Sequence, residues 1–274
     1  MNSGELKARL QGGGAAFGCM LSAVSNPRIS TVLAGGGIDY VVIDTEHASR
    51  DRGEVADLVF GLKSVGIVPI VRVASTVPYL VAVALDAGAA GVLVPYCENV
   101  EDVRACVAVA QWHPLKGEYL EKAMKGTHIS KASRDYLAAR HKDGIVIIGI
   151  ESEPAYKKLD QIMAVGGIDA LFVGPNDLST SLGAPDKFDK RYWGVCEDIC
   201  KRASARKLPV MIHHQTPETA ARAIEVGARF VLYSNETRLM QRAMQDDFTA
   251  LRAAAKKKFG GAAGTKVKDT IETV

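Results

Sequence analysis

The sequence predicts an α/β fold and, within that class, a (β/α)8 barrel formed as one domain by residues 1–259. Four segments share one pattern, in which a helical stretch ends in small residues and glycine and a β-branched run follows: residues 33–44, 85–95, 165–175 and 225–233. Four more apolar runs lie between them, at residues 16–21, 67–73, 145–150 and 208–212. About eight strand–helix units in ~250 residues match the count and length of such a barrel.

Each predicted element has a local reason. Glycine after the last helical turn supplies a left-handed cap, and runs without polar alternation are typical of strands buried on both faces of a parallel sheet. Helices are predicted between most of the strands, at residues 53–64, 77–87, 98–110, 154–165, 191–205 and 217–226. The alternative, an open doubly wound sheet, normally has a glycine-rich turn after an early strand, whereas the glycines at 12–18 precede one.

Two segments do not fit the repeating pattern. Between Pro95 and Gly144 there is room for a helix and about 30 further residues, and loops of this length are usually functional or mobile. The weakly periodic part is residues 112–144. Residues 260–274 are expected to form a peripheral or disordered tail.

Composition excludes several classes of protein. The chain has 47% hydrophobic and 24% charged residues, as globular proteins do, and a net charge of +3, which is too small to indicate a nucleic-acid partner. Its longest apolar run, residues 79–85, is far shorter than the ~20 residues of a membrane span. The N-terminus shows no secretory signal, and five scattered cysteines indicate reduced thiols, so we expect a cytoplasmic protein without a membrane partner.

Polar and ionisable residues follow the predicted strands, at the end where barrels of this type carry their chemistry. They are Ser22, Asp44 to His47, Arg72, Glu151, Asn176 and Asp177, His213 and His214, and Ser234 and Asn235. Ionisable groups are costly there unless they are paired or used. The set indicates a functional site, with structural ion pairs around the barrel mouth as the alternative.

Glu151 and Asp177 are the strongest candidates for metal ligands. They follow the fifth and sixth predicted strands, which should be neighbours about 4.8 Å apart, so both carboxylates can reach one ion. Water and a chelating substrate would complete the shell. An all-oxygen set favours Mg2+, Mn2+ or a neighbour of manganese such as Co2+. Glu153 is a rival ligand, but its place before Pro154 favours a helix-capping role.

Arg72 and His47 are the candidates for substrate binding and proton transfer. A guanidinium at the mouth suits a carboxylate or an enolate oxygen, or it pairs with Asp44 or Asp86. A histidine beside carboxylates is a ready general base, although a single loop histidine is more often structural. No lysine ends a predicted strand, which argues against Schiff-base chemistry. The last two loops lack the glycines of a phosphate site.

Several blocks of this sequence resemble the HpcH/HpaI family of metal-dependent class II aldolases, of the 4-hydroxy-2-oxoheptanedioate and 2-dehydro-3-deoxyglucarate type. The blocks are DYVVIDTEH (39–47), PIVRV (69–73), LDAGAAGVLVP (85–95), IGIESEPA (148–155) and GIDALFVGPNDLSTSLG (167–183). The resemblance spans roughly residues 5–255 in order.

The resemblance implies a barrel of the phosphoenolpyruvate/pyruvate type whose last helix packs on a neighbouring subunit, in a homohexamer built from dimers or another homo-oligomer. It implies cleavage of 4-hydroxy-2-oxo acids to pyruvate, or a related 2-oxo acid, and an aldehyde. Glu151 and Asp177 then hold the divalent metal, His47 accepts the proton, Asp86 raises the basicity of His47, and Arg72 stabilises the enolate.

The sequence departs from the family at three places. Gly149 stands where many relatives have a substrate-contacting glutamine, Asn176 where alanine is common, and Lys116 to Leu120 where relatives often have G-x-R-G. Arg72, Gly149, Asn176 and Asp177 are therefore the expected substrate-binding residues. Gly149 is expected to leave room for a bulkier or less polar aldehyde, with the segment from Leu115 to Tyr136 as the other candidate for setting specificity.

Two other functions stay open at this point. One is an acyl-CoA carbon–carbon lyase of the malyl-CoA or citramalyl-CoA type, which would need a long basic groove for the CoA. The other is a barrel that has lost catalysis, although the presence of Glu151, Asp177, Arg72 and His47 argues against it.

Overall fold

The computed structural model describes residues 1–126, 130–184 and 188–260, and within them eight parallel strands pair in chain order and close into a barrel. The predicted fold class is confirmed. The strands are β1 (Ala16–Leu21), β2 (Tyr40–Asp44), β3 (Val68–Arg72), β4 (Gly91–Val94), β5 (Ile145–Gly149), β6 (Ala170–Val173), β7 (Val210–His214) and β8 (Phe230–Asn235).

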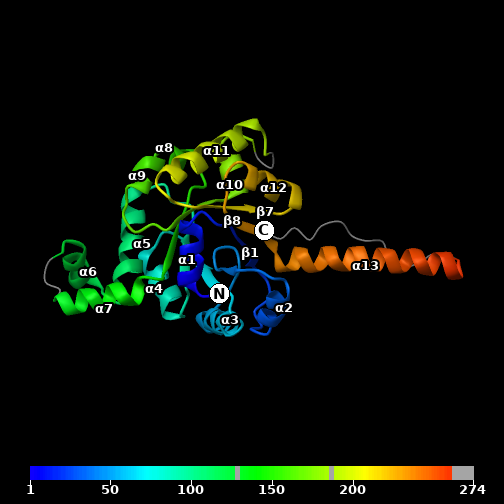
Figure 1. Ribbon diagram of the computed structural model, residues 1–274, viewed down its shortest axis with the longest axis horizontal. Helices are drawn as coiled ribbons and strands as arrows, with labels where there is room; N and C mark the ends of the chain where they lie inside the picture. The colour runs from blue at the N-terminus through cyan, green and yellow to red at the C-terminus, as the bar shows by residue number, and fades with distance from the viewer. Residues whose placement is uncertain (127–129, 185–187, 261–274) are drawn as a thin grey trace.

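Helices connect the strands and run back along the outside of the barrel (Figure 1). They are α1 (Ser3–Gln11), α2 (Ile29–Gly35), α3 (Arg52–Ser64), α4 (Pro78–Asp86), α5 (Val100–Trp112), α6 (Gly117–Met124), α7 (Lys131–His141), α8 (Glu153–Lys157), α9 (Leu159–Met163), α10 (Pro175–Ser181), α11 (Lys190–Ala205), α12 (Pro217–Glu225) and α13 (Glu236–Phe259). The helix predicted over 154–165 is two short helices that meet at Lys158.

Alternation along the strands divides the core into two parts. One cluster of buried side chains fills the barrel, including Met20, Val42, Ile70, Phe172 and Met211. The residues between them on the same strands belong to a second cluster, which packs against the helices. Because side chains alternate across a strand, the next inward positions are Asp44, Arg72 and His213. The register that buries the apolar residues therefore directs polar groups into the mouth at the carboxyl ends.

The two ends of the barrel differ. At the amino ends of the strands, α1 places Leu6 and Leu10 in the interior cluster and closes the barrel. At the side, α13 projects away from the barrel, opposite α6 and α7 (Figure 1). No helix among the described residues combines the length and hydropathy needed to cross a bilayer. Except for Gly260, the predicted tail over 260–274 lies outside the described residues.

Candidate active site

The predicted site residues gather at the carboxyl ends of the strands. A cavity of about 380 Å³ opens there, and its lining includes His47, Arg72, Glu151, Asn176 and Asp177. The lining also takes in residues that follow β1, β7 and β8. Five of the seven residues predicted for the site therefore share one cavity. Gly149 and Asp86 are not among its lining residues.

Arg72 is held by two carboxylates. Asp44 and Arg72 are direct partners in the register of β2 and β3. Arg72 Nε donates to Asp44 Oδ1 at 2.8 Å, its Nη2 lies 2.8 Å from Asp44 Oδ2, and its Nη1 lies 3.1 Å from Glu46 Oε2. Burial tends to raise the pKa of Asp44, but the hydrogen bond and charge of Arg72 outweigh it and hold that pKa below its usual value. This bidentate pair fixes the guanidinium in the mouth.

Two further charged side chains, Glu236 and Arg50, hold the backbone of the rim beside this pair. The buried carboxylate of Glu236 accepts hydrogen bonds from the backbone N–H groups of Ser22, Ala23 and Val24. Arg50 donates to backbone carbonyls on the same rim, including that of Asp44 at 3.2 Å. Since Glu236 lies more than 200 residues from Ser22, Ala23 and Val24, and Arg50 lies 26 residues from Val24, only the structure reveals this role.

Glu151 is the most deeply placed acid of the mouth. Glu151 is only 2% exposed. Its Oε2 accepts a hydrogen bond from the backbone N–H of Tyr96 at 2.5 Å. Tyr96 directs that N–H inward from a left-handed conformation, with φ at 50°. Burial is the main cause that raises the pKa of Glu151 to about 8. The Tyr96 N–H and the charge of Arg72 lower this pKa, and the neighbouring carboxylates of Glu46 and Asp177 raise it.

Two glycines make room for that carboxylate. A Cβ on Gly149 would overlap Glu151 Oε2 and lie 3.0 Å from Tyr96 N, and a Cβ on Gly174 would overlap Glu151 Oε1. The glycines end β5 and follow β6, so the carboxylate lies between two backbones. The position of Glu151 thus depends on residues without side chains.

Asp177 approaches the same place from the next unit of the barrel. It lies in the first turn of α10, which begins with Pro175, and both Asn176 and Asp177 are exposed where they line the cavity. The pairing of β5 with β6 confirms that the two acid-bearing strands are neighbours. Among the described residues, no group of three or more histidine, cysteine or acidic side chains forms a complete metal site.

His47 lies at the open edge of the mouth. Its side chain is 42% exposed, and its Nε2 lies 3.6 Å from Glu46 Oε2. The backbone N–H groups of Glu46 and His47 both face Asp44 Oδ1, at 3.0 and 3.5 Å. Asp44 therefore shapes the turn that carries His47, and Glu46 stands between the histidine and Arg72.

Comparison with known proteins adds to this geometry. The family model described as HpcH/HpaI aldolase/citrate lyase matches residues 18–236. The chain belongs to this family. It is 30% identical over 248 residues to 5-keto-4-deoxy-D-glucarate aldolase of Escherichia coli O6:H1 (strain CFT073), covering 88% of this chain and 94% of that one.

Solved structures agree on the fold. An HpcH/HpaI aldolase from Desulfitobacterium hafniense DCB-2 superimposes with a TM-score of 0.78 at 26% identity, covering 90% of this chain and 96% of that one. The citrate lyase beta subunit complexed with oxaloacetate and magnesium from M. tuberculosis shares only the fold, with a TM-score of 0.54 at 15% identity over 84% and 95% of the two chains. The predicted HpcH/HpaI resemblance and a carbon–carbon lyase of the aldolase kind are thereby confirmed.

One residue that the HpcH/HpaI resemblance implied is not brought to the site. Asp86 ends α4, just before β4 begins, and therefore lies at the amino ends of the strands. Its carboxylate is 65% exposed and lies 2.9 Å from His113 Nε2. A five-residue strand spans about 16 Å, so Asp86 cannot bond to His47 of the same chain. Within one chain the expected His47–Asp86 pair does not hold, and Glu46 is the acid beside His47.

The expectation for Gly149 also needs correction. Gly149 is not open space for an aldehyde, because the Glu151 carboxylate occupies the volume that a side chain would enter. Its contribution is to position an acid. The sequence alone does not show this, because Glu151 reaches back over the residue two positions before it.

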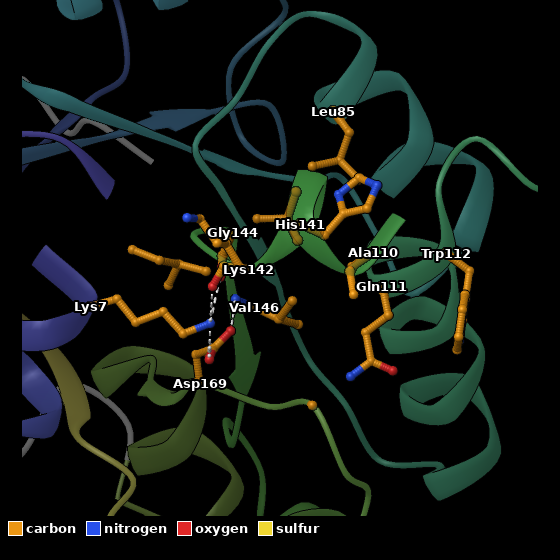
Figure 2. A pocket seen from close by; sticks show the side chains of 14 residues that line it. Lys7, Leu85, Ala110, Gln111, Trp112, His141, Lys142, Gly144, Val146 and Asp169 are labelled. Carbon is orange, nitrogen blue, oxygen red and sulfur yellow. Dashed lines mark hydrogen bonds and ion pairs between the residues drawn. The ribbon is translucent and has the colours of Figure 1, made fainter. Parts of the chain in front are cut away.

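The long connection lies at the other end of the barrel. α5 ends at Trp112 beside the amino end of β5, and α6 and α7 fill the segment before β5 begins. The ends of α5 and α7 border a second cavity there, where Lys7 Nζ meets Asp169 Oδ1 at 2.8 Å (Figure 2). Within one chain, the described parts of the segment from Leu115 to Tyr136, residues 115–126 and 130–136, therefore lie away from the mouth.

The two adjacent histidines of β7 point in opposite directions, as alternation predicts. His213 continues the inward row, with its Nε2 3.3 Å from Ser234 O. His214 turns toward α11, where it stacks on Trp193 and contacts Tyr192 Oη at 3.2 Å, but it also lines the cavity at the mouth. Burial lowers the pKa of each to about 4, so both rings are neutral at pH 7.

Proposed function

We propose that this chain is a divalent-metal-dependent class II aldolase that cleaves 4-hydroxy-2-oxo acids reversibly to pyruvate, or a related 2-oxo acid, and an aldehyde. The observation that carries the proposal is the buried Glu151 carboxylate beside Asp177, with Arg72 nearby but already paired to Asp44 and Glu46. An acid buried in this way calls for a cation as its partner.

The donor set fits a divalent metal. Glu151 and Asp177 supply oxygen ligands, and the space for the Glu151 carboxylate is kept open by Gly149 and Gly174. Oxygen ligands suit Mg2+, Mn2+ or Co2+, with water and substrate completing the shell. When bound, such an ion would polarise the 2-oxo group and offset negative charge on the enolate.

Arg72 supplies fixed positive charge beside that group. Four of its five N–H groups face Asp44, Glu46 or the sulfur of Met20. The second Nη1 hydrogen has no partner among the residues that the structure describes. That donor is available to the enolate oxygen of the 2-oxo fragment. Asn176 and Asp177 line the same cavity and are proposed to contact the substrate.

His47 is proposed as the base. It takes the proton of the C4 hydroxyl, the C3–C4 bond breaks, and the aldehyde leaves while the bonding electrons pass to the 2-oxo fragment. A proton then returns to C3 and gives pyruvate. Glu46, rather than Asp86 of the same chain, is the carboxylate positioned to orient His47.

A substrate panel tests the proposal. Purified protein is assayed with 4-hydroxy-2-oxo acids after chelation and after addition of Mg2+, Mn2+ or Co2+. We expect pyruvate to form only with metal. Full turnover by metal-free protein, or trapping of pyruvate on a lysine by borohydride, would overturn it. Malyl-CoA and citramalyl-CoA serve as a thioester arm, in which we expect no cleavage.

We also propose that the protein is a homo-oligomer in which α13 packs on a second copy. Beside the outer face of β1 and β8 lies an apolar groove of about 410 Å³, lined by residues such as Phe17, Ile224 and Leu239. Exposed Met240, Met244, Phe248 and Leu251 recur on one face of α13. An uncovered apolar helix face and an uncovered groove on one chain suit each other in two copies.

Light scattering tests this arrangement and the number of copies, which the resemblance implies to be six. Phe248→Lys should lower the mass, whereas Ala253→Lys, on the opposite face of α13, should leave it unchanged. A monomeric mass of the unmodified protein at micromolar concentration would refute the proposal. The described free cysteines are all buried, which supports a place in a reducing compartment such as the cytoplasm.

A further inference from the structure

The cavity at the mouth extends beyond the groups assigned to the metal and the enolate. Its far wall is formed by the ends of β7 and β8 and the start of α12, where His213, Gln215, Thr216 and Thr219 line it. These residues have no role in the reaction described above. A 4-hydroxy-2-oxo acid that is anchored at Glu151 and Arg72 has its aldehyde half left to place. Of the remaining lining, which also includes Ser22, Phe188 and His214, this wall is the part richest in hydrogen-bonding side chains.

The wall consists of neutral hydrogen-bonding groups. The Gln215 amide nitrogen lies 3.2 Å from His213 Nε2, and its Oε1 accepts a hydrogen bond from Ser234 Oγ at 3.3 Å. Thr216 Oγ1 and Thr219 Oγ1 lie 3.1 Å apart. Hydroxyls and amides of this kind both donate and accept, which matches the hydroxyl groups of a sugar-like chain.

The same wall offers little to a second carboxylate. Arg72 is the only lysine or arginine among the described residues lining the cavity, and it is paired to Asp44 and Glu46. The start of α12 does not compensate, because Pro217 has no N–H, Thr216 caps Thr219, and Glu218 places an acid in the first turn. An added carboxylate would be desolvated there without a cation.

From this wall we infer that the aldehyde half of the substrate is neutral and hydroxylated, bound by Gln215, Thr219 and His213. The full substrate is then a 4-hydroxy-2-oxo monocarboxylic acid with further hydroxyls, not a dicarboxylic acid. This inference rests on the proposed aldolase function. It replaces the expectation of a less polar aldehyde, and it distinguishes this chain from the E. coli relative, whose named substrate is a glucarate and therefore a diacid.

The test compares two six-carbon substrates that differ only in their last group, a 4-hydroxy-2-oxo acid ending in CH2OH and the corresponding diacid. The protein is used at full length with added Mn2+. We expect kcat/KM to favour the monoacid by at least about tenfold, because a carboxylate loses its hydration at a site that offers it no cation. Equal values, or a preference for the diacid, would overturn the inference.

Variants assign the effect to the wall. Gln215→Leu and Thr219→Val should each lower kcat/KM for the monoacid about tenfold, and Thr219→Lys should raise that for the diacid. Gln161→Leu, on the exposed side of α9, is the matched control and should change neither value. Unchanged monoacid kinetics in both wall variants would exclude the assigned residues.

Exchange of the C3 hydrogens of pyruvate in D2O separates the two proposals. This half-reaction needs no aldehyde, so all wall variants should retain it. If the unmodified protein with metal shows no exchange and no cleavage, the aldolase proposal itself fails. If exchange occurs but neither kind of aldehyde is accepted, or only the carboxylated one is, the aldolase proposal stands and the inference about the wall is wrong.

Discussion

Most acids at the mouth already have a positive or hydrogen-bonded partner. Burial raises the pKa of both Glu46 and Glu151, but Glu46 has Arg72 as a direct ion-pair partner and Glu151 does not. Asp44 is neutralised by Arg72, and Glu236 is satisfied by backbone N–H groups. Glu151 has one N–H bond against two neighbouring acids. The difference explains why a cation is assigned to Glu151 and not to the more numerous acids around it.

Removing either proposed ligand should weaken metal binding. Glu151→Gln and Asp177→Asn each replace a charged oxygen donor with a neutral one, so the dissociation constant for Mn2+ should rise at least about tenfold in calorimetry of metal-free protein. Glu153→Gln is the control, since Glu153 pairs with Lys157 and Arg191, each at 3.3 Å. Equal losses in all three variants would contradict the ligand assignment.

The glycine beside the carboxylate should matter as much as the carboxylate. In Gly174→Ala the new methyl group would overlap Glu151 Oε1, so the carboxylate must move, and Mn2+ affinity should fall about 10–100-fold. Gly194→Ala, in α11 with nothing within 4 Å, should leave affinity unchanged. Titration with Mn2+ checks both, and retained affinity in Gly174→Ala would show that Glu151 does not need its present position.

Buried His214 should make stability depend on pH. Its pKa is lowered from 6.5 to about 4, so the folded state binds fewer protons than the unfolded state between these values. The stabilisation is complete above pH 6.5 and is lost as the pH falls toward 4, by up to about 3 kcal/mol.

In His214→Gln this part of the acid sensitivity should disappear. Urea unfolding at several pH values between 4.5 and 7 measures the slope of stability against pH, which should be shallower in the variant. Parallel slopes for the two proteins would mean that His214 is not neutral in the folded state.

At the scale of elements, the buried strands were the predictable part. The run over 16–21 coincides with β1, because an apolar stretch between polar and glycine-rich sequence leaves few other boundaries. Short helices carry too few turns to show a period. Of these, α10 was not predicted, and α2 was indicated only by its glycine-rich end. The break between α8 and α9 likewise leaves the 3.6-residue pattern intact, so sequence reasoning joined them.

Sequence predicted the site residues that directly follow strands. It did not predict the positions that depend on how side chains pack. Asp44, Arg72 and Glu151 follow strands directly, so topology alone brings them together. Asp86 is away from the site because it lies at the end of α4. Gly149 has no open space beside it because the Glu151 carboxylate folds back over it. The spacing of residues along the chain predicts neither the position of Asp86 nor the surroundings of Gly149.

The first turn of α13 should contribute more stability than its exposed surroundings suggest. Glu236→Ala would leave the N–H groups of Ser22, Ala23 and Val24 without their acceptor, and we expect a loss of about 2–4 kcal/mol in urea unfolding. Glu225→Ala, which removes an exposed ion pair with Arg222, should cost less than about 1 kcal/mol. Similar losses for both would contradict the role of Glu236 as a brace.

At the scale of the whole molecule, the two ends of the barrel differ in role: the proposed reaction takes place at one end, and helices cover the other. The mouth holds the polar residues of the proposed reaction, while the amino end is closed by α1 and bordered by the ends of α5 and α7. From the sequence, the long connection was expected to be functional or mobile because loops of that length usually are. Its place follows only from the direction of α5, which carries the chain to the opposite end.

The uncovered groove beside β1 and β8 has a consequence for heat resistance. If α13 of a second copy fills it, part of the stability of each barrel exists only in the assembled form and obeys mass action. Each tenfold dilution then removes about 1.4 kcal/mol per mole of dimer. Calorimetric scans at increasing protein concentration should show a rising melting temperature, and Phe248→Lys should abolish that rise. A melting temperature independent of dilution would mean that each barrel is stable alone.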